Sequence, residues 1–372
     1  MIKILNPDVN ESGATYSVNK NGDVRYALTG IKGFGANIVE AILKEREENG
    51  LFTDIYDFVE RINLNRKAFE VLLYSGALDS FGYKRRQFEL PGRSGEPFLD
   101  EITRYADLFH RDTVDAGASL FGDVEEMRPE RPVIPEMSGE EDVLAFLQKE
   151  KELVGMFLSS HPLDRYSFEI NNFTTCNLVD LPALVNDCEA QKKQVKVLAA
   201  GIITDVKLLT TRTGKPYSRT MIEDYSGSYE LSLFGKDHEA FLQYMKPHEC
   251  LFLEGEVGEK FFLKPEERAQ GKTSPYAFKL KKVSLLGNLS ENMLSGFGFD
   301  ITTPMITPDF KENLVRVIRR HRGNIPLTMN LFDPDTRYRI QFYSRKFQVS
   351  VTTELIDDLR RIGISKYDLS LK

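Results

Sequence analysis

The sequence predicts a multidomain α+β protein with a helical first part, a β-barrel in the middle and a small α/β domain at the end. Apolar residues recur at helical spacing over residues 30–86. Runs rich in β-branched residues, separated by turn signals, fill residues 195–286. A basic helix, strands and a final helix are expected from residue 300 onward. At 372 residues the chain is too long for one ordinary core, which favours two to four domains.

Composition places the chain among cytoplasmic proteins without a membrane span. The hydrophobic fraction is 41%, the charged fraction is 28%, and no apolar run approaches the roughly 18 residues of a spanning helix. The first residues lack the apolar core of a signal peptide. The three cysteines, Cys176, Cys188 and Cys250, form no C-x-x-C pair, which argues against a disulfide framework and a zinc site.

The net charge of −7 taken alone disfavours binding to nucleic acid. The charge is distributed unevenly along the chain, however, and its local distribution matters more than the sum. Residues 61–90 hold six bases (Arg61, Arg66, Lys67, Lys84, Arg85, Arg86) against three acids (Glu70, Asp79, Glu89). An acidic, proline-rich stretch at 121–152 dilutes this patch. A local nucleic-acid site is therefore compatible with the sum.

The segment LTGIKGFG at residues 28–35, followed by a helical pattern, is typical of a helix-hairpin-helix motif. Alternate glycines permit a tight turn whose backbone N–H groups face outward at a helix N-terminus and hold a phosphate oxygen. Phe34 would anchor the turn in the core. An ordinary glycine-rich turn is the alternative. The predicted DNA-binding residues are Gly30, Lys32, Gly33, Phe34 and Gly35.

A second, weaker copy is predicted after the helix at 66–74. It comprises Gly76 and the basic cluster Lys84, Arg85 and Arg86, for which a solvated charge cluster is the alternative. Paired hairpins suit a duplex, one hairpin for each strand, with contacts to phosphate rather than to bases. Binding would then be independent of sequence and sensitive to salt.

Residues 87–135 are expected to lack regular structure, because helical periodicity is lost and Pro-Gly and Ser-Gly pairs mark linkers. Within this stretch Leu120 and Phe121 are adjacent large apolar residues in a run of small ones. Such a pair either folds back onto its own domain or docks in a partner's pocket. A helix at 140–153, capped by Ser138, follows.

Three strands, a helix and two or three further strands between residues 195 and 286 give the order of an OB-fold barrel. Basic and aromatic groups on such a barrel bind single strands by stacking and charge. Phe234 is expected in the core, where alternate aromatics of a barrel usually lie. The single-strand candidates are Lys207, Arg212, Lys215, Tyr217 and Arg219.

Catalytic patterns are missing from the sequence. The Gly271-Lys272-Thr273 run lacks the first glycine of a P-loop, since residue 266 is Glu. Asp333 and Asp335 flank a proline, which is typical of a turn rather than of a two-metal site. No metal site is expected in the chain.

The order of these features resembles the C-terminal part of the bacterial DNA polymerase III alpha subunit, the family C replicative DNA polymerase. The resemblance runs through almost the whole chain. Its motifs are PDVNES (7–12), ALTGIKGFG (27–35), LNR (64–66), SGALD (75–79) and ELVGMFLSSHPL (152–163).

The resemblance implies a domain plan of six parts. Residues 1–29 would end the fingers region, 30–110 form a tandem helix-hairpin-helix domain, 111–137 a linker, 138–194 a helical connector, 195–287 the OB domain and 300–372 the tail domain. The palm aspartates and their Mg²⁺ would lie upstream. The parent would be a DNA-directed DNA polymerase, and this segment would need no cofactor and would be inactive alone; primer extension by the purified chain would refute that.

The resemblance also implies partners: double-stranded and single-stranded DNA, a sliding clamp and the clamp loader's tau subunit. The clamp-binding motif would occupy Gly117, Ala118, Ser119, Leu120 and Phe121. This motif usually begins with Gln, so Gly117 removes a polar anchor, and either weaker binding or help from neighbouring residues is expected. The tail domain would meet tau.

Two other functional hypotheses remain for a chain that combines helix-hairpin-helix and OB modules. A DNA ligase or structure-specific nuclease combines helix-hairpin-helix and OB modules, but an NAD-dependent ligase needs a K-x-D-G lysine and commonly a zinc site, and the sequence has neither. A transfer-RNA-binding OB protein is the third reading, and the Gly-x-Gly hairpin favours DNA over it.

Overall fold

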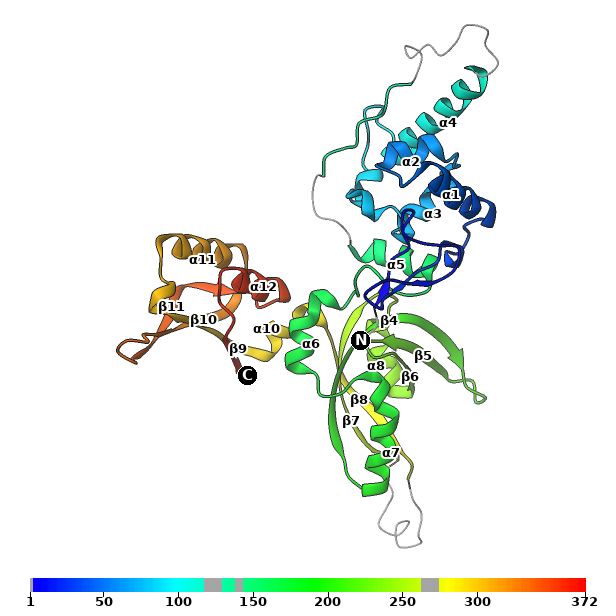
Figure 1. Ribbon diagram of the computed structural model, residues 1–372. Helices are drawn as coiled ribbons and strands as arrows, with labels where there is room; N and C mark the ends of the chain where they lie inside the picture. The colour runs from blue at the N-terminus through cyan, green and yellow to red at the C-terminus, as the bar shows by residue number, and fades with distance from the viewer. Residues whose placement is uncertain (1–2, 117–128, 138–142, 262–273) are drawn as a thin grey trace. The chain divides into compact units, whose positions relative to one another are not determined.

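The computed structural model describes residues 3–116, 129–137, 143–261 and 274–372. The chain forms two compact units, Met1–His161 and Pro162–Lys372 (Figure 1). No helix among the described residues is both long and apolar enough to cross a bilayer.

The first unit is mostly helical. A three-stranded sheet in the order β1-β3-β2 precedes the helices. Its elements are β1 (Ile4–Leu5), β2 (Ser17–Val18), β3 (Val24–Arg25), α1 (Ala36–Asn49), α2 (Ile55–Arg61), α3 (Arg66–Ser75), α4 (Phe98–Ala116) and α5 (Val143–Val154), with short 3-10 turns η1 (Leu28–Gly30), η2 (Asp79–Phe81) and η3 (Arg85–Phe88).

Side-chain caps and one continuous core position these helices. Asp54 accepts hydrogen bonds from the Tyr56 and Asp57 amides at the start of α2, and Asn65 accepts one from the Ala68 amide at the start of α3. The core runs from Val9 to Val154, so the first strands and α5 belong to the same unit as the hairpins. The domain plan had separated them.

The helix α4 corrects the expectation that residues 87–135 are irregular. It spans 19 residues, and Phe98, Leu99, Ile102 and Tyr105 on one side are buried. That spacing of three and four is helical. The turn signals just before it, at Pro91-Gly92 and Gly95, concealed the period. The expected start of the next helix, at 138–142, lies outside the described residues.

The second unit contains a five-stranded sheet in the order β6-β5-β4-β7-β8. A short helix lies between its third and fourth strands in chain order, which is the OB-fold arrangement. The pairings leave β6 and β8 at the ends, as in a partly open barrel. The elements are α6 (Ser167–Phe173), α7 (Leu181–Gln191), β4 (Val195–Thr210), β5 (Pro216–Glu223), β6 (Ser228–Phe234), α8 (Gly235–Phe241), β7 (Cys250–Glu259) and β8 (Tyr276–Leu285).

A four-stranded mixed sheet ends the unit, in the order β11-β10-β9-β12. The parallel pair β9–β10 is joined by α11, and the other pairs are antiparallel. Phe297 and Phe299 on β9 are buried. The elements are α10 (Leu289–Met293), β9 (Leu294–Thr302), α11 (Pro308–Arg320), β10 (Arg322–Phe332), β11 (Arg339–Val349), α12 (Thr353–Arg361) and β12 (Tyr367–Leu371).

Candidate nucleic-acid interfaces

The turn that enters α1 presents backbone amides to solvent. Gly33 is exposed with φ +77°, a conformation that favours glycine, and an added Cβ would meet nothing within 4 Å. Gly35 is the N-cap of α1, and no side chain caps the helix. Four amides of this turn donate to no group among the residues that the structure describes. We call them the amide turn: Gly33, Gly35, Ala36 and Asn37.

The amide turn is held by packing beneath it. Phe34 is buried at 8% exposure, as the sequence predicted. Gly30 allows close packing, because an added Cβ would lie 2.8 Å from the Tyr26 ring, whose hydroxyl donates to the Gly30 carbonyl at 3.1 Å. The Lys32 amide donates to the Leu153 carbonyl at 2.9 Å. Gly30 and the Lys32 amide therefore shape the turn, and only the Lys32 side chain is exposed for binding.

Gly76, the expected glycine of the second hairpin, lies in the interior. It ends α3 in the left-handed conformation at φ +85°, and its amide donates to the Leu73 carbonyl at 3.2 Å. An added Cβ would lie 2.6 Å from the Arg85 guanidinium. Because the residue is buried and its amide is used, the expected phosphate contact at Gly76 is corrected to a helix-ending role.

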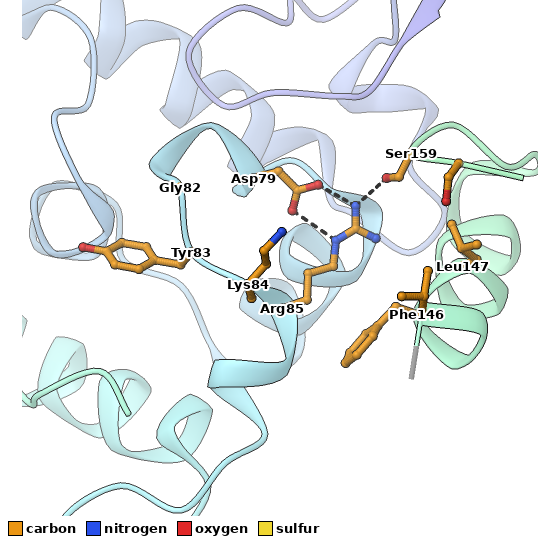
Figure 2. Close-up of a pocket in the computed structure, with 10 residues that line it drawn as sticks. Asp79, Gly82, Tyr83, Lys84, Arg85, Phe146, Leu147 and Ser159 are labelled. Atoms are coloured by element: carbon orange, nitrogen blue, oxygen red, sulfur yellow. Dashed lines mark hydrogen bonds and ion pairs between the residues drawn. The ribbon is translucent and has the colours of Figure 1, made fainter. Parts of the chain in front are cut away.

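Arg85 is likewise buried and bound within the protein (Figure 2). Its guanidinium donates to Asp79 at 2.6 Å, to Glu150 at 2.8 Å and to the Ser159 hydroxyl at 2.7 Å. Burial would lower the pKa of Arg85, but the hydrogen bonds and charges of Asp79 and Glu150 outweigh it and leave the pKa raised. The expected DNA contact at Arg85 is corrected to a structural ion pair.

Lys84 remains a candidate for phosphate binding. It is exposed at the edge of a cavity of about 290 Å³ whose other walls include Tyr83, Phe146 and Ser160 (Figure 2). Arg86 is partly buried. Of the three consecutive bases, Lys84 is therefore the one whose side chain is exposed.

The second interface is the outer face of the OB sheet. Ser218, Thr220 and Ile222 on β5 point into the barrel and are buried. Side chains alternate along a strand, so Tyr217 and Arg219 lie on the opposite, outer face. The register pairs Tyr217 with Phe234 on β6, and Lys207 on β4 with Arg219. The structure thus brings three predicted residues onto one surface.

Phe234 is a functional candidate that the sequence analysis placed in the core. It is 50% exposed, and its ring stacks on that of Tyr217 with centroids 4.8 Å apart and planes at 11°. The neighbours Leu231 and Leu233 are buried. That period of two is a signal in the sequence that places Phe234 outside. The outer face therefore carries a stacked aromatic pair, with Phe234 exposed and Tyr217 partly buried, the kind of platform on which bases stack.

The cations of this face differ in their freedom. Lys207 lies 3.2 Å from Asp205, and Arg219 lies 3.7 Å from Glu230. Arg212 and Lys215 occupy the exposed turn between β4 and β5, and neither has an ion-pair partner among the residues that the structure describes. Arg212 and Lys215 can therefore bind phosphate without first breaking an ion pair within the protein.

The expected clamp-binding residues, Gly117, Ala118, Ser119, Leu120 and Phe121, lie outside the described residues. Among the residues that are described, no three His, Cys, Asp or Glu side chains are grouped so as to hold a metal ion.

Comparisons with known proteins agree with this layout. The family described as "Helix-hairpin-helix motif" matches residues 1–88, and the family "DNA polymerase III alpha subunit, C-terminal domain" matches residues 300–368. Among solved structures, the mitochondrial single-stranded DNA binding protein Rim1 of S. cerevisiae is 16% identical, covers 25% of this chain and 95% of its own, and has a TM-score of 0.19. The OB assignment depends on strand order and not on that overlap.

Curated relatives named DNA polymerase III subunit alpha match nearly the whole chain. The Vibrio cholerae protein is 26% identical over 97% of this chain and 29% of its own, and the Escherichia coli K12 protein is 26% identical over 99% and 30%. The Deinococcus radiodurans protein is 32% identical over 64% of this chain and 18% of its own. The chain thus spans about 30% of the length of the V. cholerae and E. coli relatives.

Proposed function

The chain is homologous over nearly its whole length to DNA polymerase III alpha subunits and carries the sequence of their C-terminal domain, and from this premise we propose that it is the DNA-binding part of a replicative polymerase. The amide turn binds a phosphate of duplex DNA, and the outer face of the OB sheet binds single-stranded template. The protein works in the cytoplasm. Nucleotide incorporation is carried out by the part of the polymerase that this chain does not cover.

The observation that carries this proposal is the amide turn. Four N–H groups without a partner among the described residues lie at the start of a 14-residue helix whose first turn holds no acidic side chain. The positive end of the helix dipole adds to their attraction for an anion. Since the contacts are to backbone, binding is independent of base sequence.

The test introduces a negative charge at the amide turn. Ala36 is exposed, so Ala36→Glu does not disturb the core, and a carboxylate in the first helical turn is favourable to the helix by about 0.3–1 kcal/mol. The carboxylate occupies the position of the phosphate and repels it. We expect duplex affinity to fall about tenfold or more, the order of a lost charged hydrogen bond.

The control is Ala36→Gln, because the Gln side chain has the same size as that of Glu but no charge. It retains duplex affinity close to that of the unmodified chain in a fluorescence anisotropy titration at fixed salt. Equal affinities for the Glu and Gln variants would refute the phosphate site.

The proposed protein partners are a sliding clamp, bound by the Gly117–Phe121 segment, and the clamp loader's tau subunit, bound by the tail domain. The support is the sequence: two adjacent large apolar side chains lie in a run of small residues, and the tail matches the family's C-terminal domain.

Leu120→Ala/Phe121→Ala should abolish clamp binding and leave DNA affinity unchanged, because an apolar pocket loses both of its anchors. Surface plasmon resonance with immobilised clamp measures the first effect, and duplex anisotropy measures the second. Unchanged clamp binding would remove the assignment of this segment.

A further inference from the structure

The β10–β11 hairpin of the tail domain carries a surface that belongs to neither of the two proposed DNA sites. The two strands form a long hairpin (Figure 1). Most side chains of its outer part, residues 332–346, are exposed, with Tyr338 and Tyr343 each 72% accessible. We call residues 332–346 the arm. β11 is also the edge strand of its sheet. A long exposed edge with large aromatic side chains is a feature that proteins usually cover or charge, unless a ligand occupies it.

The two faces of the arm differ in chemistry. Met329 and Leu331 pair in register with Phe342 and Ile340, and these four continue the apolar face on which the buried Phe299 lies. The alternate residues form the opposite face, which we call the ladder face: Phe332, Asn330, Arg339, Gln341 and Tyr343.

Contacts within the ladder face hold its side chains in order. The Tyr343 hydroxyl donates to Gln341 at 2.7 Å, and the Gln341 amide donates to Asn330 at 3.1 Å. The Arg339 guanidinium lies over the Phe332 ring, 5.4 Å from its centroid. A planar guanidinium on an aromatic ring and an exposed phenol four residues further along β11 are flat surfaces that exist before any ligand arrives.

The arm carries four bases against two acids, Asp333 and Asp335, and Asp300 and Asp368 accept hydrogen bonds from Asn330 at the base of the ladder face. Arg337, Arg339, Arg345 and Lys346 have no ion-pair partner among the residues that the structure describes. By contrast, Arg316 on α11 pairs with Glu312 at 3.2 Å. The arm's Asp333 is held within its own turn, where it accepts a hydrogen bond from Thr336 at 2.6 Å.

We propose that the arm binds single-stranded nucleic acid, with phosphates at its four cations and bases stacked on Tyr343 and Arg339 of the ladder face. This is a third nucleic-acid surface, separate from the amide turn and from the OB sheet. Stacking on exposed planar groups beside free cations requires unpaired bases, which favours a single strand over a duplex. An acidic peptide would use the charge but not the planar groups; the apolar face with Ile340 and Phe342 suits a protein better.

The test variant is Arg339→Gln/Tyr343→Thr in the full chain, which removes one charge and one aromatic ring from exposed strand positions. The variant is made in the unmodified chain and in a chain that also carries Tyr217→Ala/Phe234→Ala, and each protein is titrated with a 30-nucleotide oligo-dT. In the second background, binding at the OB sheet does not mask binding at the arm. We expect affinity to fall about fivefold or more, and the slope of log affinity against log salt to fall by about 0.7, the value for one lost single-strand phosphate contact.

The matched control is Arg316→Gln/Phe342→Thr, which removes the same charge and an aromatic ring from α11 and from the other face of β11. It should bind oligo-dT within about twofold of the unmodified chain, as surface changes away from a site do. Circular dichroism checks that both variants are folded.

Each outcome is decisive. If the arm variant binds oligo-dT as tightly as the control in both backgrounds, the proposal is overturned. In that case, a lower oligo-dT affinity of Tyr217→Ala/Phe234→Ala would still support the OB interface. If poly-glutamate does not displace oligo-dT from the unmodified chain, the arm is selective for nucleic acid, as proposed. If poly-glutamate binds the unmodified chain as tightly as oligo-dT, and the arm variant loses both, the surface is an acidic-peptide site and the proposal fails.

Discussion

At the scale of the residue, Lys84 and Arg85 are neighbours in one positive cluster but differ in their surroundings. Lys84 is exposed, whereas Arg85 is 7% exposed and forms an ion pair with Glu150, which is fully buried. Charge in a sequence does not say which cation has an internal partner, because Glu150 is 65 residues away along the chain. The sequence could identify the cluster but not the role of each member.

These surroundings predict different effects on stability. Arg85→Leu leaves the Glu150 carboxylate buried without its cationic partner, which costs about 3–5 kcal/mol in the free energy of unfolding. Lys84→Ala changes it by no more than about 0.5 kcal/mol and weakens duplex binding instead. Urea denaturation followed by circular dichroism measures the first effect. Equal midpoints for the two variants would contradict the buried ion pair.

At the scale of the element, α6 carries a buried acid. Glu169 is 3% exposed, and one of its oxygens accepts a hydrogen bond from Ser290 on α10 at 2.9 Å. Burial raises the pKa of Glu169, since desolvation disfavours the carboxylate. Above the unfolded value of about 4.3 the unfolded chain releases this proton first. The contribution of Glu169 to stability is therefore present at low pH and lost as pH rises through the folded pKa.

Glu169→Gln removes this dependence on pH. The variant should melt at about the same temperature as the unmodified chain near pH 4, and about 2 °C or more above it at pH 8. Differential scanning fluorimetry over that range measures the difference. A variant that is less stable at pH 8 than at pH 4, relative to the unmodified chain, would show that the fold favours the Glu169 carboxylate and that its pKa is not raised.

The elements also show where sequence patterns are sufficient. The OB strands could be predicted because their apolar residues alternate and their turns carry Gly-Lys-Pro and Ser-Gly signals. The helix α4 was missed because turn residues at 91–95 immediately precede its pattern. Phe234 was misplaced because its ring was assigned by residue type and not by its phase relative to Leu231 and Leu233.

At the scale of the whole molecule, different surfaces are proposed to bind different forms of DNA. The amide turn belongs to the first unit, and the outer OB face belongs to the second. The sequence predicted both modules because glycine spacing and strand order are local patterns. It could not predict that Gly76 and Arg85 turn inward, since both depend on contacts with distant segments.

The measurement that tests this assignment most directly is a pair of anisotropy titrations, one with a duplex and one with oligo-dT, on Ala36→Glu and on Tyr217→Ala/Phe234→Ala. Ala36→Glu should weaken duplex binding alone. The aromatic variant should weaken oligo-dT binding about five- to a hundredfold, the range for one or two lost stacking contacts, and leave the duplex unaffected. If each variant weakens both ligands equally, or neither ligand, the two surfaces do not divide the DNA as stated.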